Sequence, residues 1–187
     1  YDQVQGATGI MVGKGKIVVA CEGIPDDRLG MELRVIGWTV PEGEYFRSES
    51  FTLHNGLNVL EKTSDWNGLA YVCNYNTAGL GTAGDIKVHI INGSVNGILT
   101  PDKTNEELQR ILDNSCYSTI DLMGERVHSV WEVNALKTYT KGQYVRYINV
   151  LDQLIKWEHE LVGFEKYGLV PKNKTMAYVN YNYYMYQ

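Results

Sequence analysis

Short segments rich in β-branched and aromatic residues follow one another through the first half of the chain, and Gly or Pro separates nearly all of them. In one segment Ile17, Val19 and Cys21 occupy every second position, which is typical of a strand with one buried face. Successive short strands without helices between them predict a sandwich or a barrel, and we expect a β-sandwich over residues 1–95. The expected strands are residues 8–12, 16–22, 32–38, 50–53, 58–62, 69–74 and 86–91.

The second half of the chain has longer hydrophobic periods, typical of helices, between fewer strand-like segments. Thr104 followed by Glu106 and Glu107 forms an N-cap with an acidic first turn, which predicts the start of a helix. We therefore expect an α+β segment over residues 96–187. Its expected elements are a helix at 104–113, a strand at 119–123, a helix at 130–139, a long helix at 143–167 and a strand at 176–186.

The long helix has an apolar face and carries a fragment of a metal motif. Its apolar face consists of Val145, Ile148, Leu151, Ile155 and Val162, with Leu154 and Leu161 beside it. His159 and Glu160 match the first two positions of the zinc-protease motif H-E-x-x-H, but Gly163 stands where the second His would be. We interpret His159 as a partly exposed helical side chain and not as a zinc ligand.

Composition excludes several classes of protein. The chain has 187 residues, 44% of them hydrophobic, which is enough for the core of one large domain or two small ones. Its net charge of -5 argues against a nucleic-acid-binding surface. No run of about 18 apolar residues predicts a transmembrane helix, and the first residues lack a signal-peptide pattern, which leaves the compartment open. Cys21, Cys73 and Cys116 are too far apart for a C-x-x-C motif, so we interpret them as mostly buried thiols.

Two loops contain glycine-rich sequences that need to be weighed as phosphate-binding sites. Residues 13–16 and 78–84 both join expected strands and lack the helix start of a phosphate-binding loop. We interpret both as hairpin turns and expect no cofactor in this chain.

Aromatic residues at strand ends form a candidate glycan-binding site. Trp66 lies within residues 64–68, whose composition is typical of a turn, and Tyr75 follows the next expected strand. An exposed aromatic ring can stack on the apolar face of a sugar, so Trp66 and Tyr75 are candidate glycan-binding residues. Packing of the indole into the core is the alternative reading.

The order of several segments resembles a known family. TGIMVGKGKIVVA, FTLHNGLNVLEKTSDWNGLAYVCN and DIKVHIING are followed by LDQLIKWEHELVGFEKYG and MAYVNYNYYMY. This succession, which spans nearly the whole chain, resembles the N-terminal part of enhancin-like, gluzincin-type zinc metallopeptidases directed at mucins and other glycoproteins. The resemblance implies a β-rich subdomain followed by the start of a peptidase subdomain, here incomplete. It also implies that the H-E-x-x-H motif and a more distal Glu lie C-terminal to the Tyr-rich strand, beyond this chain.

The chain itself shows no catalytic motif. Metal-assisted hydrolysis needs zinc ligands and a carboxylate that activates the bound water. None of His54, His89, His128 and His159 has a second His four residues away, and Cys116 has no identifiable base. We therefore assign no catalytic and no metal-binding residue, expect this chain to be inactive by itself, and expect zinc only in a complete parent enzyme.

Three hypotheses follow for function. The resemblance favours the N-terminal region of an enhancin-like metallopeptidase acting on mucin-type glycoproteins, located outside the cell or on its surface. The alternative is a non-catalytic glycan- or glycoprotein-binding module that uses Trp66 and Tyr75. The third is an interaction protein whose strand at 176–186, with aromatic residues on both faces, pairs with another chain. Under either a truncated-enzyme or an interaction reading, we expect self-association through this strand.

Overall fold

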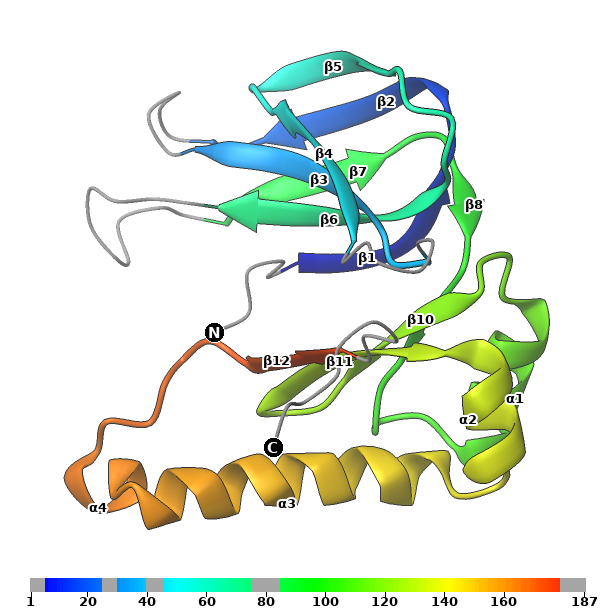
Figure 1. The fold of residues 1–187 in the computed structure, drawn as a ribbon. Coiled ribbons are helices and arrows are strands. Elements are labelled where there is room, and N and C mark those ends of the chain that lie inside the picture. Colours follow the sequence, from blue (N-terminus) through cyan, green and yellow to red (C-terminus); the bar gives the residue numbers. More distant parts are fainter. Residues whose placement is uncertain (1–5, 25–29, 40–45, 75–84, 179–187) are drawn as a thin grey trace. The chain divides into compact units, whose positions relative to one another are not determined.

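The computed structural model describes residues 6–24, 30–39, 46–74 and 85–178 (Figure 1). The chain divides into two compact units: an N-terminal unit, Val4–Val95, and a C-terminal unit, Asn96–Gln187 together with Tyr1–Gln3. The described part is mainly β, with three sheets and a few helices.

The N-terminal unit consists of two antiparallel sheets. One has the strand order β4-β3-β6-β1-β8 and the other β5-β2-β7 among the described residues. Each of the seven expected strands is present within a few residues of its expected position. The strands are β1 (Gly6–Val12), β2 (Gly15–Glu22), β3 (Met31–Gly37), β4 (Arg47–Thr52), β5 (Gly56–Lys62), β6 (Gly68–Asn74), β7 (Lys87–Ile90) and β8 (Ser94–Val95).

The two sheets of the N-terminal unit share one hydrophobic core. Ile17 and Val19 of β2 pack in the same cluster as Leu33 and Val35 of β3, and all four side chains are buried. The period of two in β2 therefore buries one face of that strand, as the sequence predicts. Burial of these apolar side chains stabilises the unit by about 1.5–3 kcal/mol for each fully buried residue.

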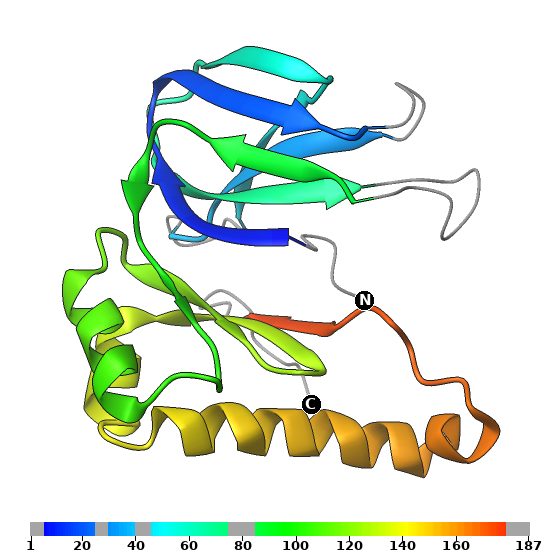
Figure 2. The same ribbon diagram turned by 180° about the vertical axis from the view of Figure 1, so that it is seen from behind.

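The C-terminal unit has a mixed sheet with helices packed on it. The described strand order is β12-β11-β10-β9; β10 and β11 pair antiparallel, whereas β9 and β12 pair parallel with their neighbours. The helix α3 runs along one face of this sheet (Figures 1 and 2). The elements are β9 (Ile98–Leu99), α1 (Asn105–Asn114), β10 (Thr119–Met123), β11 (Val127–Glu132), α2 (Val133–Tyr139), α3 (Tyr144–Leu161), α4 (Phe164–Tyr167) and β12 (Thr175–Tyr178).

The start of α1 is confirmed by its capping geometry. Thr104 accepts a hydrogen bond from the Glu107 N–H, and the Glu107 carboxylate accepts one from the Thr104 N–H. This capping box satisfies two backbone donors that the first helical turn leaves without intrahelical partners.

The helix expected at 130–139 begins three residues later than predicted, so the prediction is wrong for residues 130–132. Val130 and Trp131 belong to β11, which pairs with β10 through Asp121 and Ile120, and α2 begins only at Val133. These residues complete a hairpin with β10, and pairing in that hairpin outweighs the local helical pattern.

The long helix expected at 143–167 is interrupted. It ends at Leu161, and Gly163 has φ of 82°, a left-handed conformation that breaks the helical ladder before α4. Val162, expected in the apolar core face, is consequently 61% exposed, whereas Ile148 and Ile155 are buried. None of the helices in the described part of the chain has the length and apolarity that a membrane span requires. Of the strand expected at 176–186, residues up to 178 are described as part of β12.

Candidate functional site

The face of the C-terminal unit where the β10–β11 turn meets α3 holds several charged side chains. Asp152 of α3 accepts hydrogen bonds from three successive backbone N–H groups of this turn: Glu125 at 2.6 Å, Arg126 at 2.8 Å and Val127 at 3.0 Å. A Cβ at position 124 would overlap the Asp152 carboxylate, which explains why the turn contains Gly124. The carboxylate therefore fixes the hairpin on the helix.

His159 belongs to the same cluster and is buried, not partly exposed as the sequence predicted. Its Nδ1 lies 3.5 Å from Nη1 of Arg126, and its ring packs against Phe164 with centroids 5.6 Å apart. The Arg126 guanidinium in turn donates to Glu165 Oε1 at 2.7 Å. The prediction failed because the β10–β11 turn and α4 cover this end of α3, and both contacts are tertiary.

A second histidine is bonded inside the sheet. His128 on β11 and Asp121 on β10 are both fully buried, and their Nε2 and Oδ1 atoms are 2.8 Å apart. They are two residues out of register, since Asp121 pairs with Val130 and His128 with Met123. A buried imidazole bonded to a carboxylate is a stable structural pair, and it orients both side chains within the sheet.

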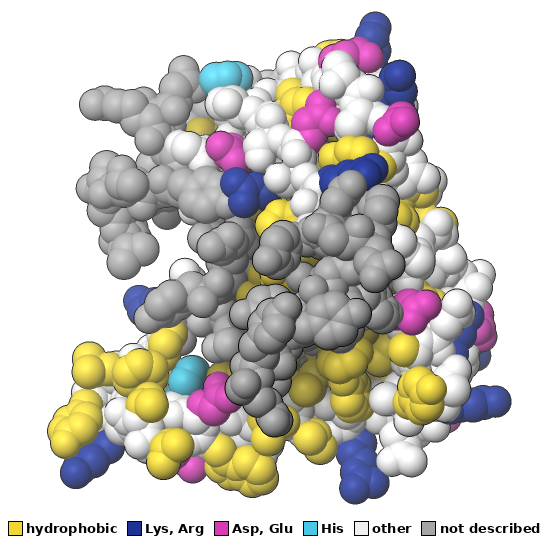
Figure 3. Space-filling model, in the orientation of Figure 1, with side chains coloured by type: hydrophobic (Ala, Val, Ile, Leu, Met, Phe, Trp, Pro, Cys, Tyr) yellow, Lys and Arg dark blue, Asp and Glu magenta, His cyan; other side chains and the backbone are white. Residues whose placement is uncertain are grey.

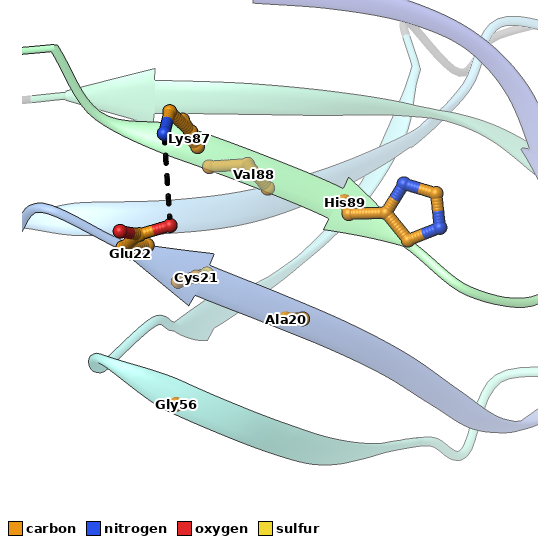
Figure 4. A pocket seen from close by; sticks show the side chains of 7 residues that line it. All are labelled: Ala20, Cys21, Glu22, Gly56, Lys87, Val88 and His89. Carbon is orange, nitrogen blue, oxygen red and sulfur yellow. Dashed lines mark ion pairs between the residues drawn. The ribbon is translucent and has the colours of Figure 1, made fainter.

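The N-terminal unit contains an open pocket of about 570 Å³ on the β5-β2-β7 sheet. Glu22 and Lys87 form an ion pair of 3.8 Å at one end, and His89 lies farther along β7 (Figure 4). Because Glu22 and Lys87 are both more than three-quarters exposed, the pair contributes little to stability. Cys21 lies beneath, and burial raises the pKa of its thiol, which makes it a poor nucleophile.

Trp66 is half-buried and packs against the core of the N-terminal unit, which agrees with the alternative reading of its turn context. A Cβ at Gly37 would lie only 2.8 Å from the indole, so this glycine makes room for it. Lys62 Nζ lies 3.9 Å from the ring centroid and donates hydrogen bonds to the Ser64 and Trp66 carbonyls. One face of the indole is thus already covered by a cation, while Tyr75 lies outside the described residues.

The described residues do not supply a zinc site. His54 and His89 are exposed on separate strand regions, His128 bonds Asp121, and His159 contacts Arg126. In residues 6–24, 30–39, 46–74 and 85–178, no three His, Cys, Asp or Glu side chains come together in a group that could hold a metal. Of the cysteines, Cys21 and Cys73 are buried and Cys116 is exposed.

Comparison with known proteins finds relatives among solved structures. No protein-family model and no curated protein matches the chain. A metallopeptidase from Bacteroides thetaiotaomicron is similar, with 26% identity and a TM-score of 0.76, over 94% of this chain and 30% of that chain. A metallopeptidase in complex with Tn antigen is also 26% identical, with a TM-score of 0.77, over 94% of this chain and 34% of that chain.

A more distant structure shares the fold. The M60 catalytic domain of ZmpC from Clostridium perfringens, in complex with the sialyl T antigen, has 14% identity and a TM-score of 0.75, over 95% of this chain and 40% of that chain. The chain thus spans about a third of the length of the metallopeptidase structures it matches. The chain is thus similar to a segment found within metallopeptidases, of which one is solved in complex with Tn antigen and another in complex with the sialyl T antigen.

Proposed function

We propose that this chain is the N-terminal region of an enhancin-like, gluzincin-type zinc metallopeptidase that acts on mucin-type glycoproteins outside the cell or on its surface. The observation that carries the proposal is the match to two metallopeptidases at 26% identity over 94% of the chain. In this proposal the N-terminal unit is the β-sandwich subdomain, and the C-terminal unit begins the peptidase subdomain. The zinc ligands then lie in a part of the enzyme that these residues do not include.

In this proposal the described residues form a rigid support for the zinc site and carry out no step of peptide hydrolysis themselves. A catalytic zinc needs ligands, an open coordination position and a carboxylate, held on rigid elements. The C-terminal unit offers such a rigid element, because Asp152 fixes the β10–β11 turn on α3 and His128 bonds Asp121 inside the sheet. We assign no step of peptide hydrolysis to these residues.

The first test of this proposal is the coding sequence on both sides of the segment that encodes the chain. An H-E-x-x-H motif with a more distal Glu, in the same reading frame and C-terminal to these residues, supports the proposal. A reading frame without a zinc motif contradicts it.

A biochemical test follows from the same proposal. The chain by itself is dialysed, analysed for zinc and incubated with a mucin-type glycopeptide, alongside the longer polypeptide. We expect stoichiometric zinc and chelator-sensitive cleavage from the longer polypeptide alone. Tightly held zinc or cleavage in the chain alone would overturn the assignment of the zinc ligands to other residues.

A non-catalytic glycan-binding role is the second candidate, and its glycan-binding part is supported by the neighbours solved with Tn antigen and with the sialyl T antigen. It is tested by titrating a Tn-antigen glycopeptide into the chain, into Trp66→Ala and into the matched variant Trp66→Phe. Since Lys62 covers one face of the indole, we expect Trp66→Ala to destabilise the N-terminal unit by roughly 2–3 kcal/mol. Weaker binding by Trp66→Ala under conditions where it remains folded, with binding retained by Trp66→Phe, would assign a glycan contact to this residue.

A further inference from the structure

The helix α3 has two apolar faces, and one of them lies outside the hydrophobic core that the described residues of its unit form. Tyr144, Ile148 and Ile155 are buried in the core of the C-terminal unit. A second set of large apolar side chains on the same helix is exposed: Val150 at 47%, Leu154 at 45%, Trp157 at 56% and Leu161 at 87%. We call this second set the α3 stripe.

The α3 stripe has the spacing of a coiled-coil seam. Its residues are separated by four, three and four positions, the alternation of the a and d positions in a heptad. At about 100° per residue they fall within a sector of roughly 60° that points away from the buried face. Figure 3 shows hydrophobic side chains gathered over this helix and over α4.

The stripe is larger than the scattered apolar residues of an ordinary surface. It extends over roughly three turns of helix, and Val162, Tyr167 and Leu169, which follow it in the sequence, are also exposed. A contiguous apolar patch of this kind marks an interaction surface, whereas single exposed apolar residues do not.

The charges beside the stripe define what can cover it. Glu158 and Glu160 are exposed and flank its C-terminal half, at the e and g positions of the heptad that places Leu154 and Leu161 at a. Flanking positions of this kind select a partner by opposite charge. The stripe therefore favours a partner with basic flanks, and it disfavours an anionic lipid surface.

A second copy of the chain does not meet this requirement. In a parallel, in-register pair Gln153 would lie opposite Glu158. In an antiparallel pair centred on the stripe, with Val150 facing Leu161, Gln153 would lie opposite Glu160 and Leu151 opposite Glu158. Neither arrangement places a basic side chain against the two carboxylates.

We infer that the α3 stripe is the docking face for an amphipathic helix with aliphatic residues along its seam and Lys or Arg at its flanks, contributed by the remainder of the same peptidase polypeptide. The source of the helix rests on the proposed function. It is argued from the metallopeptidase structures, of whose length this chain covers only 30% and 34% while matching 94% of itself.

The first experiment titrates the chain with a synthetic helical peptide that has Leu at its a and d positions and Lys at e and g. Trp157 fluorescence and calorimetry report binding. We expect saturable one-to-one binding that weakens with salt, and binding at least roughly tenfold weaker for a peptide with Glu at e and g. Equal binding of both peptides, or binding of neither, overturns the inference, and so does self-association of the chain through the stripe in sedimentation.

Variants separate the stripe from other surfaces. Leu154→Glu with Leu161→Glu abolishes peptide binding, whereas Leu57→Glu, at a residue 67% exposed on the N-terminal unit, leaves it unchanged. Glu158→Lys with Glu160→Lys reverses the preference toward the Glu-flanked peptide. All five substituted positions are exposed, so circular dichroism is expected to show unchanged folding. Stripe and flank variants that bind like the parent overturn the inference.

The source of the helix is tested on the longer polypeptide, independently of its proteolytic activity. There the stripe is already covered, so the Lys-flanked peptide does not bind and acrylamide quenches Trp157 less than in the chain alone. Persistent peptide binding by an active, zinc-containing enzyme overturns the intramolecular source while the proposed function stands. A reading frame without a zinc motif instead overturns the proposed function and, with it, this source.

Discussion

Replacement of Asp152 tests how the C-terminal unit is held together. Its carboxylate accepts hydrogen bonds from the N–H groups of Glu125, Arg126 and Val127, two of them in partly buried positions. In Asp152→Ala these donors lose a charged acceptor, and only the exposed one regains water freely. Hydrogen bonds to charged groups contribute about 1.5–3 kcal/mol each, so we expect Asp152→Ala to cost roughly 3 kcal/mol.

Asp152→Asn is expected to lower the stability less than Asp152→Ala does. Asp152→Asn keeps one oxygen, which can still accept from Arg126 and Val127, but turns an amide donor toward the Glu125 N–H. We expect it to cost roughly 1 kcal/mol, because only the exposed bond is lost. Glu160→Gln on the same helix is the matched control, since it removes only an exposed ion pair with Lys156 at 3.7 Å and should cost less than about 0.5 kcal/mol.

The assay is urea denaturation, followed by the fluorescence of Trp131 and Trp157, which lie in the C-terminal unit. With a slope of about 2 kcal/mol per molar urea, the expected loss in Asp152→Ala moves the midpoint by roughly 1.5 M. If the midpoints of Asp152→Ala and Glu160→Gln agree, the three hydrogen bonds contribute nothing net, and the account of how the hairpin is fixed is wrong.

Three further predictions use the same unit. Asp121→Ala leaves His128 buried beside a cavity and should cost about 3 kcal/mol, whereas Asp121→Asn costs less; a urea series in which the two variants are equal refutes this. The backbone N–H of Thr104 and, after it, the Thr104 side chain hold the pKa of Glu107 below its ordinary value of 4.5, so the helix is stabilised above that pH and loses this stabilisation as the pH falls through the lowered pKa. Thr104→Ala keeps the backbone donor and removes the hydroxyl, so it should raise the Glu107 pKa only part of the way to 4.5 in an NMR titration, and a rise all the way to 4.5 contradicts the backbone N–H as the main cause. Self-association through residues 176–186 stays a prediction, and sedimentation across a concentration series decides it, since a chain that remains monomeric throughout excludes it.

The sequence predicts the strands of the N-terminal unit and the start of α1 because both depend on local patterns. Alternation of Ile17 and Val19 defines one face of β2 within a few residues. Thr104 and Glu107 form the N-terminal cap of α1 within one helical turn. Such signals need no knowledge of the rest of the fold.

The failures arise where contacts between distant residues decide the structure. Val130 joins a strand because Asp121 pairs with it, and His159 is buried because Arg126 and Phe164 cover it. The end of α3 had a local signal, Gly163, which the continuing apolar pattern obscured. The hydrogen bonds of Asp152 to the β10–β11 turn join residues 25 to 27 positions apart. The only local sequence signal for them is the Gly-Glu-Arg turn composition at 124–126.

Because Lys62 is buried, its chemical modification reports how often the N-terminal unit opens. It is the only lysine in the described part of the chain with no exposed surface, and its ammonium is held by the Ser64 and Trp66 carbonyls. Burial lowers the pKa of Lys62 in the folded unit. Once the unit opens this effect is lost, and the amine acylates as readily as that of any exposed lysine. An acyl group on Lys62 removes a donor and adds bulk, which prevents the side chain from returning to its place. The fraction of molecules acylated at Lys62 therefore counts those in which the N-terminal unit has opened during exposure to the reagent.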